Sequence, residues 1–147
     1  MTADSTKTRT VDAHNLRSDR DKCMDIVLLL MVYFYQQNKL NIDWSRLELI
    51  WPEFLSRLRS CKLEVPGFYQ DLGTRSYRDL HDAFFWLSGA GFGEYFLRDR
   101  HLYLTLSSKV ARAIIEKSDP GEVKIIFKVA PKMLQCYNRT RYQPPAY

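Results

Sequence analysis

The sequence is poor in cysteine and lacks any long apolar segment. Its 147 residues include three cysteines, Cys23, Cys61 and Cys136. Because this number is odd and the spacings are wide, we expect neither a disulfide framework nor a zinc ribbon. The longest apolar run, Ile26 to Tyr35, is too short for a membrane span, which takes about 20 residues. We therefore predict a cytoplasmic protein with reduced thiols and no membrane contact.

Motifs of catalysis and cofactor binding are also missing. The patterns H-E-x-x-H, C-x-x-C and G-x-x-x-x-G-K-[ST] do not occur. The glycine-rich segment 89–93 follows a predicted helix and leads into a predicted strand, whereas a phosphate-binding loop needs the reverse order. We predict no enzymatic activity, no cofactor and no metal. A small enzyme with His81 or His101 beside a cysteine or aspartate is the third alternative.

Acidic residues are absent from residues 123–147, which carry five bases. Residues 1–22 contain five bases and four acids, and residues 23–122 contain twelve bases and thirteen acids. Most of the net charge of +5 therefore lies in the last 25 residues. A near-neutral body with a basic end predicts a local contact with something acidic.

Apolar and aromatic residues are abundant, at 46% and 14% of the chain. A chain of this length and composition can bury a core as one domain. The polar residues 1–17 are predicted to form a flexible arm. We place the folded domain at residues 18–130 and a basic aromatic tail at residues 131–147.

The predicted fold is α+β and mainly α. Serine followed three residues later by an acid marks three helix starts, at residues 18–21, 45–48 and 76–79. The first helix, to about Asn38, is apolar on most sides and should be buried centrally. Pro52 either kinks the second helix or begins another. Gly89 and Gly91 end the third.

A β-hairpin is predicted next, because residues 92–97 and 101–106 are rich in aliphatic and aromatic side chains around a polar turn. Ser107 or Ser108 then caps a short amphipathic helix. Pro120-Gly121 is predicted as a turn and residues 123–129, which alternate, as a further strand. The tail follows from Pro131.

Two helices followed by a third that runs straight into a hairpin resemble a winged-helix domain. The resemblance is carried by Ser76-Tyr77-Arg78-Asp79-Leu80, then Leu87 and Gly91, then Tyr103-Leu104-Thr105-Leu106. The step from Gly73 to Leu80 also resembles Panacea-type antitoxin domains and small middle components of bacterial defence systems built around ABC or SMC-like ATPases. These families imply a winged-helix surface used on proteins at least as often as on DNA.

Protein-binding residues are predicted from the aromatic side chains. Phe84, Phe85 and Trp86 are consecutive, and a helix cannot bury three adjacent residues on one face. At least one should therefore reach the surface or a partner. In the tail, tyrosine favours an ordered contact because it is enriched at interfaces. The predicted partner-binding residues are Phe85, Trp86, Tyr137, Tyr142 and Tyr147.

Nucleic-acid contacts are predicted from the exposed cations. The third helix would enter the major groove of DNA, but it offers few of the side chains that read bases, and Asp79 and Asp82 oppose phosphates. The hairpin turn could touch phosphates, and the tail mixes cations with tyrosines, a combination that attracts nucleic acid. The candidate residues are Arg75, Arg78, Arg98, Arg100, Lys128, Lys132, Arg139 and Arg141.

The sequence thus leaves two main hypotheses. The first is a protein-binding winged-helix subunit of a larger intracellular complex, such as a nucleic-acid-handling or antiviral defence assembly. The second is a DNA-binding transcriptional regulator or antitoxin.

Overall fold

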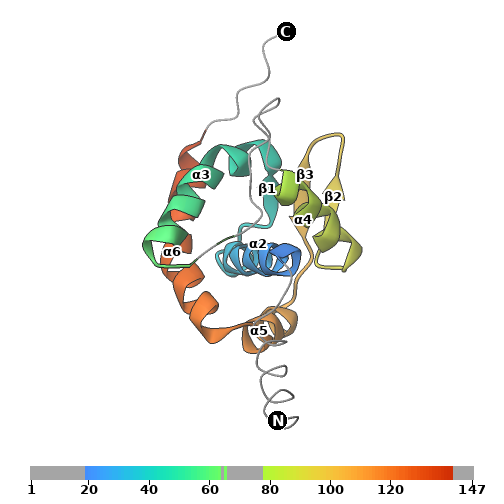
Figure 1. The fold of residues 1–147 in the computed structure, drawn as a ribbon. Helices are drawn as coiled ribbons and strands as arrows, with labels where there is room; N and C mark the ends of the chain where they lie inside the picture. The colour runs from blue at the N-terminus through green and yellow to red at the C-terminus, as the bar shows by residue number, and fades with distance from the viewer. Residues whose placement is uncertain (1–18, 64, 66–77, 141–147) are drawn as a thin grey trace, which may run out of the picture.

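The fold is α+β and mainly helical. A computed structural model describes residues 19–63, 65 and 78–140 (Figure 1). Within these residues it contains five helices and a three-stranded antiparallel sheet. In chain order the elements are α2 (Asp19–Gln36), β1 (Asn41–Asp43), α3 (Trp44–Ser60), α4 (Arg78–Gly89), β2 (Gly93–Phe96), β3 (His101–Leu104), α5 (Ser108–Lys117) and α6 (Pro120–Arg139).

The helix α2 forms the centre of the core, as the sequence predicts. Every residue from Ile26 to Val32 is buried, and Phe34 is fully buried near the end of the helix. The other helices and the sheet surround α2 in Figure 1. After the helix ends, Asn38 adopts a left-handed backbone with φ of 63°. The apolar run from Ile26 to Tyr35, which is too short to span a membrane, thus forms most of a buried helix.

The helix α3 is continuous across Pro52. Its buried side chains recur at spacings of three and four, as predicted. Pro52 is exposed, so the carbonyl that loses its hydrogen-bond partner faces the outside of the protein. The helix begins earlier than the serine pattern predicts, because Asp43 is the N-cap and its carboxylate accepts a hydrogen bond from the Ser45 N–H at 2.9 Å.

The sheet has the order β1-β3-β2. The predicted hairpin is confirmed as β2 and β3, with Tyr95 opposite Leu102. The strand β1 is not predicted from the sequence, and it pairs with β3 through Ile42 opposite Leu102. A Cβ atom at Gly93 would lie 2.7 Å from the Tyr103 carbonyl oxygen, so this close approach of β2 to β3 requires glycine.

The last two elements are α5 and α6. Ser107 caps α5 by accepting a hydrogen bond from the Val110 N–H at 3.1 Å, as predicted. The strand predicted at residues 123–129 is wrong, because this segment lies inside α6. The tail predicted from Pro131 does not begin there either, since the helix continues to Arg139.

The helical pattern explains this correction. Within α6 the buried positions Ile126, Val129, Ala130, Met133 and Tyr137 recur at helical spacing and pack against the core. Pro131 is exposed, so water can solvate the carbonyl that it leaves without a helical partner. Pro131 therefore does not end the helix.

Candidate interaction surfaces

The helix α4 presents aromatic side chains outward. Leu80, Ala83, Phe84 and Leu87 are fully buried, and they hold the helix against the core. The two residues that follow Phe84 point away from it: Phe85 and Trp86 expose 43% and 38% of their surface. The prediction that the three consecutive aromatic residues cannot all be buried is confirmed.

Ring contacts join these two side chains to the hairpin. Phe85 makes an edge contact with Tyr95 of β2, with ring centroids 5.3 Å apart. Trp86 lies against Phe92, which precedes β2, at 5.9 Å. We name these four residues, Phe85, Trp86, Phe92 and Tyr95, the aromatic surface. It spans the C-terminal half of α4 and the start of the hairpin.

His81 is half-buried beside this surface and contacts several rings. Its imidazole contacts Phe85 at 4.8 Å, Trp44 at 5.1 Å and Tyr95 at 5.6 Å. Burial lowers the pKa of His81 and Arg100 lowers it further, against the opposing effects of Asp82 and Glu48. Burial also raises the pKa of Tyr95. Both side chains are therefore uncharged near neutral pH.

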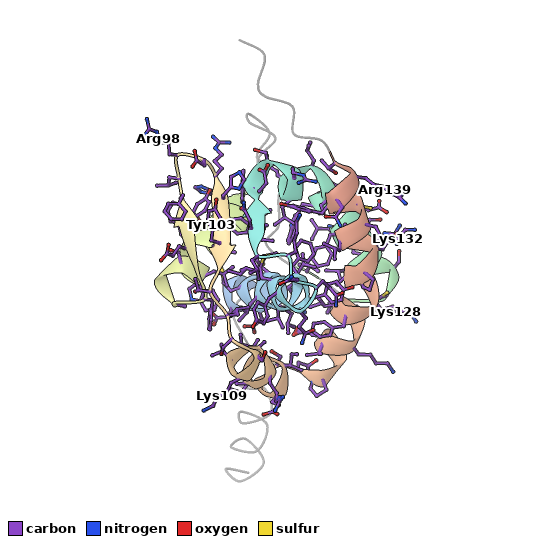
Figure 2. The ribbon with its side chains drawn as sticks, turned by 180° about the vertical axis from the view of Figure 1, so that it is seen from behind. Arg98, Tyr103, Lys109, Lys128, Lys132 and Arg139 are labelled. Carbon is purple, nitrogen blue, oxygen red and sulfur yellow. The ribbon has the colours of Figure 1, made fainter. Side chains whose placement is uncertain are left out.

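The hairpin turn carries the two predicted arginines. Arg98 and Arg100 are exposed, and Arg98 extends from the tip of the hairpin in Figure 2. Arg100 has a left-handed φ of 55°, and its carbonyl accepts a hydrogen bond from the Trp44 N–H at 2.9 Å. The turn is thereby anchored to the start of α3.

The outer side of α6 carries a row of cations. Lys124, Lys128, Lys132 and Arg139 are all exposed, and their spacings of four, four and seven residues place them within about 80° of arc on an ideal helix. Figure 2 shows Lys128, Lys132 and Arg139 pointing away from the protein. We name these four residues the basic stripe. The sequence shows that these residues are cations. Because it predicts a strand and a tail for this segment, however, it gives no reason to place them on one helix face.

No acidic side chain shares this side of α6. Glu122, the one acid in the helix, is buried with 5% exposure. Among the residues that the structure describes, none of the four stripe cations forms an ion pair. The positive charge of the stripe is therefore not neutralised by any exposed acidic side chain of α6.

Tyr137, predicted as a partner contact, is instead a core residue with 1% exposure. Its hydroxyl oxygen accepts a hydrogen bond from the Asp43 N–H at 2.6 Å, and its ring packs edge-on against Phe34 at 5.6 Å. The Arg46 guanidinium lies 4.5 Å from the ring centroid. Burial raises the pKa of Tyr137, and the Asp43 hydrogen bond and Arg46 oppose this. Tyr137 therefore fastens α6 to the core and offers no surface to a partner.

Arg46 also closes the end of α6. Its Nη2 donates to the Tyr137 carbonyl at 2.7 Å, and its Nε donates to the Thr140 carbonyl at 2.9 Å. A cation at this position satisfies carbonyls that a helix end leaves open and complements the helix dipole. The basic stripe is therefore held on a helix whose last turn is fixed to α3.

Several predicted residues are not placed. Arg75, Arg141, Tyr142 and Tyr147 lie outside the described residues, and Arg78 lies in α4 with its side chain outside that description. The predicted arm, residues 1–17, also lies outside it.

The described part of the chain holds no group of three or more His, Cys, Asp or Glu side chains that is arranged to bind a metal ion. No described helix has the length and apolar character needed to cross a membrane. An open cleft of about 840 Å³ lies between the end of α2 and α5, with Arg112 and Glu116 as its charged lining residues.

In comparisons with protein-family models, curated proteins and solved structures, the chain has no match.

Proposed function

We propose that this chain is a non-enzymatic winged-helix subunit that binds a protein partner through its aromatic surface. The observation that carries the proposal is the pair of adjacent exposed rings, Phe85 and Trp86, on α4. Aromatic side chains are enriched at the centres of protein interfaces, where their burial contributes much of the binding energy.

The order of elements supports the winged-helix part of the proposal. Helix, strand, helix, helix and hairpin follow one another along the chain, and β1 pairs with the hairpin at the edge formed by β3. In such a fold α4 occupies the place of a recognition helix and the β2–β3 hairpin the place of the wing.

The composition of α4 favours a protein partner over DNA bases. Base edges are read mainly by Arg, Lys, Asn and Gln. The described outward side chains of α4 are instead Phe85 and Trp86, with His81 and Asp82 half-buried beside them. A neutral histidine and an aspartate give little attraction for phosphates, whereas burial of the two rings by a partner contributes favourable free energy.

A partner-capture experiment with matched variants tests this function. The tagged full chain is isolated from its native cells after nuclease treatment, alongside F85S/W86S and the control L49S. Leu49 is 64% exposed and belongs to α3, not to the helix or the hairpin that carries the aromatic surface. We expect a stoichiometric protein partner with the wild type and L49S, and its loss with F85S/W86S.

Folding of each variant is checked by thermal melting. Because Phe85 also contacts His81 and Tyr95, the single variant W86A provides a milder change on the same surface. Equal capture by the wild type, F85S/W86S and W86A would contradict the proposal, as would a partner that disappears on nuclease treatment.

A DNA-binding regulator or antitoxin is the second candidate. The specific observation in its favour is the exposed pair Arg98 and Arg100 at the hairpin tip, where a wing reaches phosphates or the minor groove. Under this alternative, R98Q/R100Q weakens duplex DNA binding and reduces its salt dependence by nearly one unit of slope for each lost contact. We expect no such change under the first candidate.

A further inference from the structure

The exposed face of α6 carries charges of one sign, unlike that of α3. The neighbouring helix α3 pairs charges of opposite sign on its exposed side, where the Arg57 Nε lies 2.8 Å from the Glu53 carboxylate, four residues earlier. The α6 stripe repeats that four-residue spacing with lysine alone at positions 124, 128 and 132. Like charges at this spacing destabilise a helix. The stripe therefore does not serve the stability of α6.

The stripe also lacks apolar anchors. Besides the four cations, the exposed positions of α6 from residue 121 onward are Gly121, Pro131, Gln135 and Asn138, while its large apolar side chains are buried or half-buried against the core. A helix that lies on a membrane inserts apolar side chains, and the centre of a protein interface is rich in aromatic and apolar groups. Neither kind of partner matches an exposed face of cations and small polar groups.

A regular polyanion matches it better. Along α6 the stripe extends for about 22 Å from Lys124 to Arg139, given a rise of 1.5 Å per residue. A nucleic-acid duplex presents phosphates on each strand at about 3.4 Å of axial rise, so the stripe spans roughly six base pairs. Flexible lysines can reach phosphates over this length without reading any base.

We propose that the basic stripe of α6 binds the phosphate backbone of a nucleic-acid duplex, independently of sequence. The site lies on the opposite side of α2 from α4 and the hairpin (Figures 1 and 2). It is therefore separate from the aromatic surface, and the protein can hold a protein partner and a duplex at once. The inference does not depend on the proposed function.

Salt dependence gives this proposal a quantitative test. Fluorescence anisotropy of the full chain with a labelled DNA duplex of about 20 base pairs is measured between about 50 and 200 mM salt. Four phosphate contacts contribute a slope of about −3.6 to log K against log salt, which is a roughly 150-fold loss of affinity over that range. The variant K128Q/K132Q should reduce the slope by about 1.8 and weaken binding at 50 mM salt by about two orders of magnitude.

The matched control removes the same charge elsewhere. Lys109 and Lys117 are exposed at the two ends of α5, and Lys109 lies away from the stripe in Figure 2. We expect K109Q/K117Q to keep the wild-type slope and F85S/W86S to bind the duplex normally. Loss of duplex binding in K128Q/K132Q with partner capture intact would separate this site from the proposed function.

Further probes distinguish the sources of phosphate. An RNA duplex of the same sequence, the corresponding single strand and a polyglutamate peptide are measured in parallel. Binding of either duplex with the expected change in slope supports the proposal. Absence of duplex binding at 50 mM salt, equal losses in the stripe and control variants, or equally tight binding of the single strand or of polyglutamate would overturn it.

Discussion

The aromatic surface and the basic stripe lie largely on two helices, α4 and α6, that pack against the core in the same way. Both α4 and α6 bury an apolar face against α2, yet their outward faces have opposite character. On α4, large rings are left in contact with water, and on α6 like charges repel one another. Neither arrangement favours the stability of the isolated protein. The core thus fixes how each helix lies, while the outward positions are free to serve binding.

The largest effect on stability is expected when a buried ring of α4 is removed rather than an exposed one. Phe84 is fully buried and its neighbour Phe85 is 43% exposed. We expect F84A to lower the free energy of unfolding by about 3–5 kcal/mol, because it removes a buried ring and leaves a cavity. F85A should lower it by much less. Urea denaturation of the two variants measures the difference, and equal losses would show that Phe85 is a core residue.

A second substitution tests how α6 is fixed. Y137F removes the hydroxyl that accepts the Asp43 N–H, so a buried donor is left without its partner. We expect the free energy of unfolding to fall by about 1–3 kcal/mol. Duplex binding by the folded variant should remain, because the stripe side chains are unchanged. Unaltered stability in denaturant melts would contradict the assigned role of Tyr137.

A third substitution separates stability from binding on the stripe. K128E replaces two like-charged pairs, with Lys124 and Lys132, by two attractive ones. We expect the free energy of unfolding to rise by about 0.8–2 kcal/mol while duplex affinity falls. K128Q, which only removes repulsion, should give a smaller rise. A lower melting temperature for K128E would show that the lysine row stabilises α6.

The smallest expected effect is a pH dependence of stability, which comes from His81 beside the aromatic surface. The pKa of His81 is lowered in the folded protein, so below its ordinary value of 6.5 the unfolded chain binds more protons. Stability should therefore fall as the pH drops below about 6.5, until the folded-state pKa is passed. The variant H81Q should lose this part of the dependence in melts compared at pH values on either side of the window. Identical pH profiles for the two proteins would contradict it.

The sequence predicts the parts of the fold that depend on local patterns. The buried α2, the helical face of α3, the β2–β3 hairpin and the Ser107 cap each follow from periodicity or capping within one segment. The strand β1 has three residues, too few for alternation to appear, and it exists because it pairs with residues 101–103 of β3. Such pairing cannot be derived from residues 41–43 alone.

The error in α6 has a different cause. Val123, Ile125, Phe127 and Val129 alternate, which favours a strand, but Ile126, Ala130, Met133 and Tyr137 continue at helical spacing beyond Pro131. The core provided by α2 and α3 selects the helical pattern. The exposed rings of α4 could be anticipated from three consecutive aromatic residues, whereas the basic stripe became apparent only once α6 was known to be a helix.

The hydrogen bond between Asp43 and Tyr137 also bears on how the protein is made. It joins residues 94 positions apart, so the core cannot close until Tyr137 has left the ribosome. At a synthesis rate of roughly 5–20 residues per second, α2 and α3 wait about 5–20 s for α6 to cover them. During this interval their apolar faces are open to solvent. The nascent chain should therefore recruit a chaperone more strongly when translation is slowed between codons 60 and 137, after α2 and α3 have been made, than when it is slowed before codon 60.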